Sequence, residues 1–414
     1  MSRRGQSQGS LHTGLSLRHN IGILGLSITA QLSRDLVLIL LLGFGSALDV
    51  VKASTAIQIY LFTTMASAAA NHFHGTKGAR VGDYFVVYAA FAILAQYFLF
   101  DLVVAPGFTG EKLEDARFYG HIALFVSLMV MPYAVYRYRY LETRSYPLIA
   151  GQQLVVSLAY VAGFVVLFQF ADGTPAAFFA YCFAVLLYFA LIVFRRGRPA
   201  IGIGWKDLAP SAAGLMIWTS VFAAQAAQSS ARFIDRAFAS TIGDGYFAVI
   251  DVIYAAMAGV TLLPLGIFNI FAAAHFAGRS AWQRKVSLLI SAGAISALAI
   301  ALPFLAGIGA SEQFAIAGIP FSAREAGLAL IAPIAFMAGT LGFQSLLALG
   351  ESRAAFAIVA LKMGAKLAYL LTQPQVTLFD IVATIVVTEA LASLLSVWRF
   401  IVLRGRTGKT VSGS

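Results

Sequence analysis

Long apolar runs, separated by short polar or glycine-containing stretches, follow one another from about residue 20 to the C-terminal end. A helix needs about 20 apolar residues to cross a hydrocarbon core of roughly 30 Å, and runs of that length recur along the chain. The pattern therefore predicts an all-α membrane protein with about twelve transmembrane helices. The predicted spans are 20–44, 50–72, 81–105, 119–137, 147–170, 175–194, 209–231, 245–276, 286–309, 326–349, 353–373 and 378–402.

The composition agrees with membrane insertion. Hydrophobic residues make up 60% of the 414 residues and charged residues 11%, whereas a soluble domain carries roughly a quarter charged residues. The formal net charge of +11 does not point to nucleic acid, because most basic residues fall in alternate loops, as they do on the cytoplasmic side of membrane proteins. We therefore expect a multi-pass protein of the bacterial inner membrane with both ends inside. The outer loops collect Asp101, Glu111, Glu114, Asp115, Asp172, Asp244, Glu312, Glu325 and Asp380.

A short pattern occurs twice at an offset of two hundred residues. Asp35, Gly43 and Gly45 match Asp235, Gly243 and Gly245. An even number of spans per half would bring both halves into the membrane in the same sense, so we expect two six-helix bundles around a central cavity. The predicted organisation is a basic cytoplasmic segment 1–19, an N-terminal lobe 20–198, a C-terminal lobe 199–404 and a basic cytoplasmic tail 405–414.

A small set of charged residues lies in or near the predicted spans. Because a charge that faces lipid is costly, each should line a wet cavity, pair with another charge or reach the headgroups. We expect Lys52, Arg232 and Asp251 to reach the headgroups. The whole set is Arg34, Asp35, Asp49, Lys52, Arg232, Asp235, Arg236, Asp251, Lys362, Lys366 and Glu389.

Two interpretations are open for the paired charges of the repeat, Arg34-Asp35 and Asp235-Arg236. They could exchange partners as a gate that closes the outer side of the cavity, or they could form static pairs within each half. An intramembrane carboxylate such as Asp49 or Glu389 could couple transport to protons or sodium.

Lys362 and Lys366 stand four residues apart, so both ammonium groups lie on one face of the eleventh predicted span. One interpretation is a binding site for a phosphate or pyrophosphate headgroup, which Arg34 would share. The other is a cationic face that packs on Glu389 of the twelfth span.

Signals for catalysis and cofactors are weak. The longest outer loop, 101–118, carries several acids, and we expect it to be solvated and without regular structure. His72 and His74 lack a third ligand nearby, so no metal site is expected. The chain shows neither a nucleotide-binding loop nor a Ser/His/Asp pattern. We expect no enzyme and no cofactor.

Residues 33–49 resemble the first-helix region of the MviN-like lipid II flippases. Residues 234–270 are similar to the seventh and eighth helices of that family, and residues 343–356 to a third region. These flippases belong to the multidrug/oligosaccharidyl-lipid/polysaccharide exporter (MOP) superfamily, together with O-antigen and exopolysaccharide flippases and MATE drug exporters. The matching first-helix positions are Arg34, Asp35, Gly45 and Asp49.

The chain also departs from the lipid II flippases. Members of that family have fourteen spans and several cavity arginines, but this chain has Phe62 and Tyr254-Ala255 at two of the arginine positions. Twelve spans are usual for O-antigen-type flippases and MATE exporters. The resemblance thus implies the fold and a transport function.

We therefore expect a flippase that moves a polyprenyl-pyrophosphate-linked saccharide (an exopolysaccharide, O-antigen or peptidoglycan precursor) across the inner membrane by alternating access. Membrane lipids, a coupling proton or sodium ion, and a glycan polymerase or glycosyltransferases are the expected partners. One alternative is a MATE-like, cation-coupled exporter of small molecules. Another is an inactive membrane scaffold in envelope assembly.

Overall fold

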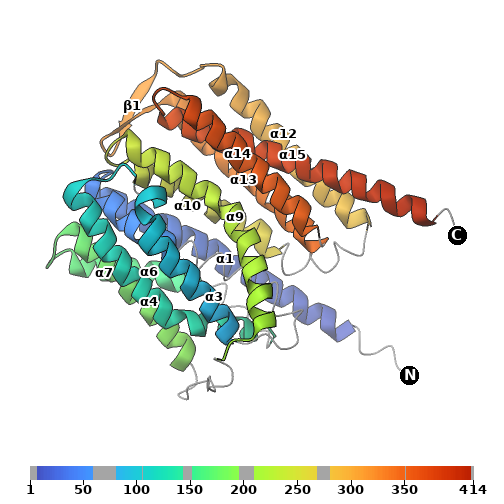
Figure 1. Ribbon diagram of the computed structural model, residues 1–414, viewed down its shortest axis with the longest axis horizontal. Coiled ribbons are helices and arrows are strands. Elements are labelled where there is room, and N and C mark those ends of the chain that lie inside the picture. Colours follow the sequence, from blue (N-terminus) through green and yellow to red (C-terminus); the bar gives the residue numbers. More distant parts are fainter. Residues whose placement is uncertain are drawn as a thin grey trace. The chain divides into compact units, whose positions relative to one another are not determined.

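A computed structural model describes residues 7–58, 81–104, 106–142, 152–194, 209–267, 280–349 and 351–411. Within these ranges the chain is helical apart from short turns and one β-hairpin (Figure 1). Phe62 and the predicted His72 and His74 pair lie outside the described residues.

Contacts divide the chain into two compact units. The first unit contains Met1–Leu42, Ser54–Phe98 and Asp115–Phe222, and the second contains Gly43–Ala53, Leu99–Glu114 and Ala223–Ser414. Two short segments from the N-terminal half of the sequence thus belong to the second unit.

The first unit is a helical bundle in which α1 packs against α6 and α6 packs against α7. A small apolar core includes Ala123, Val126, Phe178 and Cys182. The Cys182 thiol is buried there, as expected for a packing residue. The elements that lie wholly or partly in this unit are α1 (Ser7–Leu42), α3 (Val81–Leu94), the π-helical η2 (Ala95–Val104), α4 (Gly110–Glu142), α6 (Gln152–Leu167), α7 (Gly173–Phe194) and the start of α9.

The second unit is built around α13, which packs against α10, α12, α14 and α15. Small residues let α15 approach α13 closely, as in many membrane helix pairs: a Cβ on Gly339 would lie 2.3 Å from Glu389 Oε2. The elements are α9 (Ala212–Ile242), α10 (Tyr246–Ile267), α12 (Ser280–Leu305), β1 (Gln313–Ile316), β2 (Ile319–Ser322), α13 (Ala323–Ala348), α14 (Ser352–Thr372) and α15 (Leu378–Val411).

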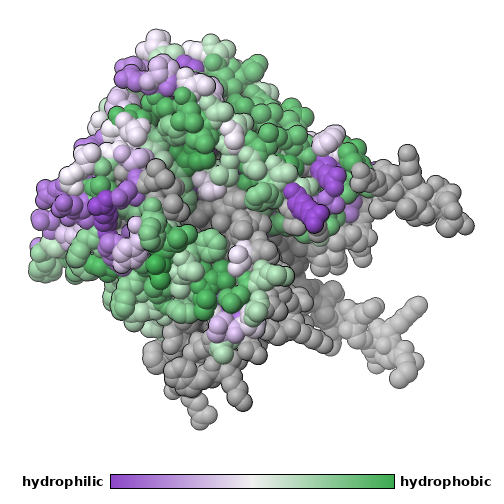
Figure 2. Space-filling model, viewed as in Figure 1, coloured by the Kyte–Doolittle hydropathy of each residue, from purple (hydrophilic) through white to green (hydrophobic). Residues whose placement is uncertain are grey.

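The described helices have the polarity of a membrane protein. Six of them are long and apolar enough to cross a bilayer, yet they are only partly buried: Ala281–Leu305 has a mean hydropathy of 2.3 with 22% of that stretch buried. Figure 2 shows hydrophobic residues along the sides of the helices and hydrophilic ones gathered mainly near helix ends. The apolar side chains face outward while charged ones are buried. This arrangement is expected for a protein surrounded by lipid and not by water. The prediction of an all-α membrane protein is confirmed, and predicted spans such as 50–72 and 245–276 extend beyond the described residues.

The β-hairpin was not predicted. β1 and β2 pair antiparallel with Ile316 opposite Ile319, and the turn places Ala317 at φ 50° and Gly318 at φ 91°. Two successive residues with positive φ are typical of a tight hairpin turn. The first of them is alanine, not the usual Asn, Asp or Gly, so the sequence signal for a hairpin is weak.

The prediction that residues 101–118 form a solvated loop without regular structure was wrong. η2 extends to Val104, and α4 begins at Gly110, so Glu111, Glu114 and Asp115 lie in the first turns of a helix. Carboxylates are favourable there because unpaired N–H groups at the helix N-terminus attract negative charge. The connecting segment is therefore short.

The repeated Asp/Gly pattern has the same local structure in both places. α1 ends at Leu42 and a helix resumes at residue 46, while α9 ends at Ile242 and α10 begins at Tyr246. The new helix is started by equivalent hydrogen bonds, Asp49 N to Gly45 O and Val249 N to Gly245 O, both 3.0 Å. The order helix, turn, helix is thus the same in both places, but the turns differ, since Gly245 has φ 87° and Gly45 has no positive φ. A repeat of the two whole halves stays a prediction.

Candidate intramembrane site

Two lysines of α14 enter the interior of the second unit one helical turn apart. Lys362 and Lys366 are buried. Lys362 Nζ lies 2.9 Å from Glu389 Oε1 on α15, and Lys366 Nζ lies 2.7 Å from Asp235 Oδ2 on α9. Each ammonium group therefore has its own carboxylate.

Two further side chains complete this group. The Tyr254 hydroxyl on α10 donates a hydrogen bond to Asp235 Oδ2. The Arg232 guanidinium, one turn before Asp235, lies 5.3 Å from the Tyr254 ring centroid and 5.2 Å from that of Phe336, where a cation is attracted by the ring face. We call Arg232, Asp235, Tyr254, Lys362, Lys366 and Glu389 the ion-pair cluster.

The charges of the ion-pair cluster do not cancel. Three basic side chains, Arg232, Lys362 and Lys366, face two carboxylates, so the net charge is positive. Asp235 is fully buried, and its Oδ1 has no hydrogen-bond partner among the described residues. The cluster thus contains a buried acceptor that is not used, which is uncommon for a purely structural network.

A second set of charges surrounds Asp251 on α10. Lys52 Nζ lies 3.1 Å from Asp251 Oδ2, and the Arg236 guanidinium bonds to Asp251 Oδ1. The expectation that Lys52 and Asp251 reach the headgroups was wrong, because both pair with partners inside the second unit. A paired charge avoids the cost of facing lipid.

Asp49 holds the start of α10. Its carboxylate accepts hydrogen bonds from Gly245 N at 2.8 Å and Ala248 N at 2.9 Å, two amides that have no partner within the helix. Lys112 Nζ lies 2.8 Å from Asp49 Oδ2 and 2.7 Å from Asp244 Oδ1. Asp49 thus caps a helix that lies about two hundred residues further along the chain, and Lys112 was not singled out from the sequence.

In the first unit, Arg34 and Asp35 bond to each other. Arg34 Nη2 lies 2.9 Å from Asp35 Oδ1, and the guanidinium carbon lies 5.8 Å from the Tyr160 ring centroid. Asp35 is buried. This is a pairing within one unit, as in the static interpretation of the repeat.

The structure brings some predicted site residues together and separates others. Lys362, Lys366, Asp235 and Glu389 meet in the ion-pair cluster, whereas Arg236 turns to Asp251. Tyr254 belongs to the cluster and Phe336 lies beside its Arg232. Both are neutral aromatic residues, which charge patterns in the sequence do not reveal. Among the described residues, no group of three or more His, Cys, Asp or Glu side chains could hold a metal ion.

The fold is that of MOP-superfamily transporters. A lipid II flippase, MurJ, in an inward closed conformation aligns over 92% of this chain and 86% of its own, with a TM-score of 0.64 and 14% identity. The Vibrio cholerae MATE transporter VcmN aligns over 95% and 97%, with a TM-score of 0.55 and 17% identity. A further MATE family multidrug transporter of the MOP superfamily, in an outward-facing conformation, aligns over 96% of this chain and 96% of its own, with a TM-score of 0.54 and 15% identity.

Neither protein-family models nor curated protein sequences match the chain. The likeness is therefore one of structure, and it covers flippases and drug exporters alike. At such identities it establishes the fold, while the choice of substrate depends on the chemistry of the ion-pair cluster.

Proposed function

We propose that the protein is a flippase of the bacterial inner membrane that moves a polyprenyl-pyrophosphate-linked saccharide from the inner to the outer leaflet by alternating access. The observation that supports this most directly is the pair of buried lysines one turn apart on α14, Lys362 and Lys366, each of which bonds to a single carboxylate. Two buried ammonium groups this close attract an anionic headgroup and repel an organic cation.

The lysine pairs suggest how a headgroup would be received. A pyrophosphate that reaches α14 would compete with Glu389 and Asp235 for Lys362 and Lys366, which are point charges with three donors each. Partner exchange of this kind keeps each lysine paired with an anion both with and without substrate. Arg34, which we expected to share the headgroup, would contribute only if it left Asp35.

The topology belongs to the same proposal. Connections 43–45, 106–109, 243–245, 306–322 and 373–377 meet at one end of the second unit, as bonds such as Phe44 N to Ala317 O (3.3 Å) and Gly107 N to Ser240 Oγ (3.0 Å) show. The basic-residue bias of the loops assigns this end to the outside, with both termini in the cytoplasm. We place the lobes at 20–198 and 199–404, with glycosyltransferases or a polymerase as neighbours in the membrane.

Reconstitution tests the function. Proteoliposomes would receive a fluorescent polyprenyl-pyrophosphate-linked saccharide, and a membrane-impermeant quencher would report its transfer between leaflets. We expect Lys362→Gln/Lys366→Gln to slow transfer at least tenfold, because a buried charge-assisted contact is worth about 1.5–3 kcal/mol. Lys285→Gln is the matched control, since Lys285 is exposed on α12. Equal rates in the double variant and the wild type would overturn the role of the cluster.

The MATE-like alternative has its own readout. If the protein exports organic cations, ethidium efflux from the same vesicles should depend on Asp235 and Glu389, and transfer of the lipid-linked saccharide should be absent. In cells, accumulation of lipid-linked saccharide in the inner leaflet after loss of the gene supports the flippase. Normal glycan export with both lysines replaced would favour an inactive scaffold.

A further inference from the structure

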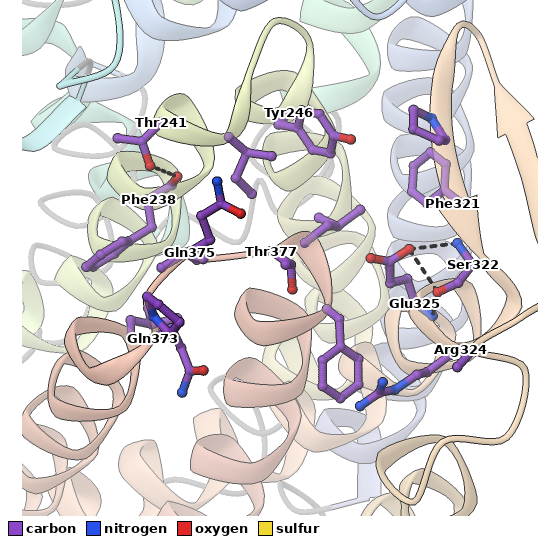
Figure 3. Close-up of a pocket in the computed structure, with 18 of the residues that line it drawn as sticks. Phe238, Thr241, Tyr246, Phe321, Ser322, Arg324, Glu325, Gln373, Gln375 and Thr377 are labelled. Atoms are coloured by element: carbon purple, nitrogen blue, oxygen red, sulfur yellow. Dashed lines mark hydrogen bonds between the residues drawn. The ribbon is translucent and has the colours of Figure 1, made fainter.

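A cavity lies at the end of the second unit where its connections meet. Its volume is about 840 Å³, within the size range of small-molecule sites. Figure 3 shows Gln373, Gln375 and Thr377 on one side and Tyr246, Ser322 and Glu325 on another. The cavity is distinct from the ion-pair cluster, because none of the cluster's six residues lines it.

Much of the lining is neutral and able to form hydrogen bonds. Gln313 and Gln375 carry amides, and Tyr246 a hydroxyl, for which the structure gives no hydrogen-bond partner among the described residues. An amide offers two donors and an acceptor, and a phenol offers one of each. Aromatic rings from Phe238, Phe321 and Phe379 stand beside them. Amides and hydroxyls interleaved with flat apolar rings fit the hydroxyl edges and C–H faces of a sugar.

Two lining residues are charged, Arg324 and Glu325, and no ion pair is found for either among the described residues. The Arg324 guanidinium lies over the Phe379 ring, 3.1 Å from its centroid, and the buried Nε has no hydrogen-bond partner in this part of the chain. The neighbouring Glu325 is already engaged, because Oε2 accepts hydrogen bonds from Ser322 N at 2.7 Å and Ser322 Oγ at 2.9 Å. A guanidinium held flat against a ring presents its edge for bidentate binding of a carboxylate.

We infer that this cavity binds a saccharide unit that carries a carboxylate, with Arg324 on the carboxylate and Gln313, Gln375 and Tyr246 on the hydroxyls. The inference rests on the proposed function, since a glycan that has crossed the membrane would emerge at this end. It narrows the substrate class to glycans with an acidic sugar. It also gives the saccharide a binding site of its own, apart from the pyrophosphate.

Binding of two matched probes tests the inference. The full chain in lipid nanodiscs would be titrated with a β-1,4-linked glucuronate tetrasaccharide and with cellotetraose, which differs in lacking the carboxylates. Saturation-transfer NMR would measure binding. We expect the glucuronate probe to bind about tenfold more tightly or better, since hydrogen bonds to a charged group are the stronger ones. Equal binding of the two probes would overturn the inference.

Variants locate the site. Arg324→Gln should remove the preference for glucuronate and leave cellotetraose binding unchanged, while Arg324→Lys should keep only part of it because the planar fork is lost. Gln375→Ala should weaken both probes. Arg399→Gln is the matched control, since Arg399 lies further along α15, outside the cavity lining, and pairs with Glu351. Unchanged glucuronate binding in Arg324→Gln would refute the assignment, and size-exclusion profiles would verify that each variant is folded.

Two further measurements distinguish failure of the cavity assignment from failure of the proposed flippase function. Inorganic pyrophosphate that binds through Arg324 while glucuronate does not would overturn the saccharide assignment. If the wild type transfers lipid-linked saccharide but binds no glucuronate probe, the cavity assignment fails and the flippase stands. If glucuronate binds through Arg324 but no lipid-linked saccharide is transferred, the flippase fails and the cavity remains a saccharide site.

Discussion

Lys366 and Asp235 show how strongly a single buried residue can depend on its partner. Their side chains are 2% and 0% exposed, and removing one partner leaves an uncompensated buried charge, which typically costs about 3–5 kcal/mol. We expect Lys366→Met to lower the thermal unfolding temperature in detergent by many degrees. The measurement is a melting curve followed by intrinsic fluorescence.

The double variant is the control for that prediction. Asp235→Asn/Lys366→Met removes both charges, so much of the lost stability should return even though transport does not. If the double variant were as unstable as the single one, the loss would come from packing and not from the unpaired carboxylate.

Two glycines of the repeat should respond differently to the same change. Gly245 has φ 87°, and a Cβ there would lie 2.8 Å from Ile319 Cδ1 and 2.9 Å from the Phe44 carbonyl carbon. Gly45 stands at the matching position with nothing within 4 Å and no positive φ. Gly245→Ala should therefore cost of order 1–3 kcal/mol or more, and Gly45→Ala about 0.5 kcal/mol or less. Melting temperatures compare them, and equal losses would contradict the prediction.

At the scale of single residues, sequence reasoning found the charges but not all of their partners. A charge in an apolar run is conspicuous, so Lys362, Lys366, Asp235 and Glu389 could be predicted as a group. Partners such as Tyr254 and Lys112 come from distant segments: Lys112 is 63 residues from Asp49 and 132 from Asp244. Nothing local in the sequence indicates such contacts.

Among the helices, α13 and α15 are held together by small residues that also shape the ion-pair cluster. Gly339 leaves room for the Glu389 carboxylate, which a methyl group would meet at 2.3 Å. Gly339→Ala should therefore push Glu389 away from Lys362, lower the melting temperature and slow transport. Gly364 lies on α14 between the two lysines, and a Cβ there would have no atom within 4 Å. Gly364→Ala should therefore stabilise the helix by up to about 1 kcal/mol through its higher helix propensity.

The opposite signs expected for these two substitutions make the comparison specific. Both replace a helical glycine by alanine, so propensity alone would stabilise both. A stabilising effect of Gly339→Ala would show that Glu389 can relocate without cost. Thermal unfolding and the vesicle transfer assay should change together for Gly339→Ala if the Glu389–Lys362 pair matters for both.

Helices were easier to predict than the segments that join them. Apolar runs near the length of a bilayer mark α13 and α14 to within a few residues, since a membrane leaves few alternatives to a helix. For α15 they mark the start, whereas the helix continues to Val411, beyond the predicted end at 402. The β-hairpin and the start of α4 were missed because short polar segments fit several conformations. About half of the residues that line the cavity beside Arg324 come from the connections 306–322 and 373–377, so that part of the lining could not be predicted from the sequence.

For the whole molecule, the placement of apolar residues outside and charged residues inside could be predicted. The division of the chain into two compact units could not. Composition alone indicates lipid-facing apolar helices around buried charges. Segments such as Gly43–Ala53 join the second unit through bonds like Lys52 to Asp251. Such contacts link positions almost two hundred residues apart, beyond the range of any local pattern.

Transport by the whole protein should be coupled to protons and not to sodium. If Lys366 leaves Asp235 for a pyrophosphate, a fully buried carboxylate loses its counter-ion, and Oδ1 has no hydrogen-bond partner among the described residues to compensate. An unpaired buried charge is costly, whereas a protonated carboxyl is far less so. Headgroup binding should therefore take up a proton, and affinity should rise as the pH falls.

Calorimetry and ion replacement measure this coupling. Titration of polyprenyl pyrophosphate in buffers of different ionisation enthalpy should show net proton uptake in the wild type and less in Asp235→Asn, which cannot be protonated at that position. Replacing sodium by potassium should leave vesicle transfer unchanged, because the two carboxylates of the ion-pair cluster bind lysines and not a cation. Transfer that requires sodium at constant pH would show instead that a metal ion displaces Lys362 or Lys366 during transport.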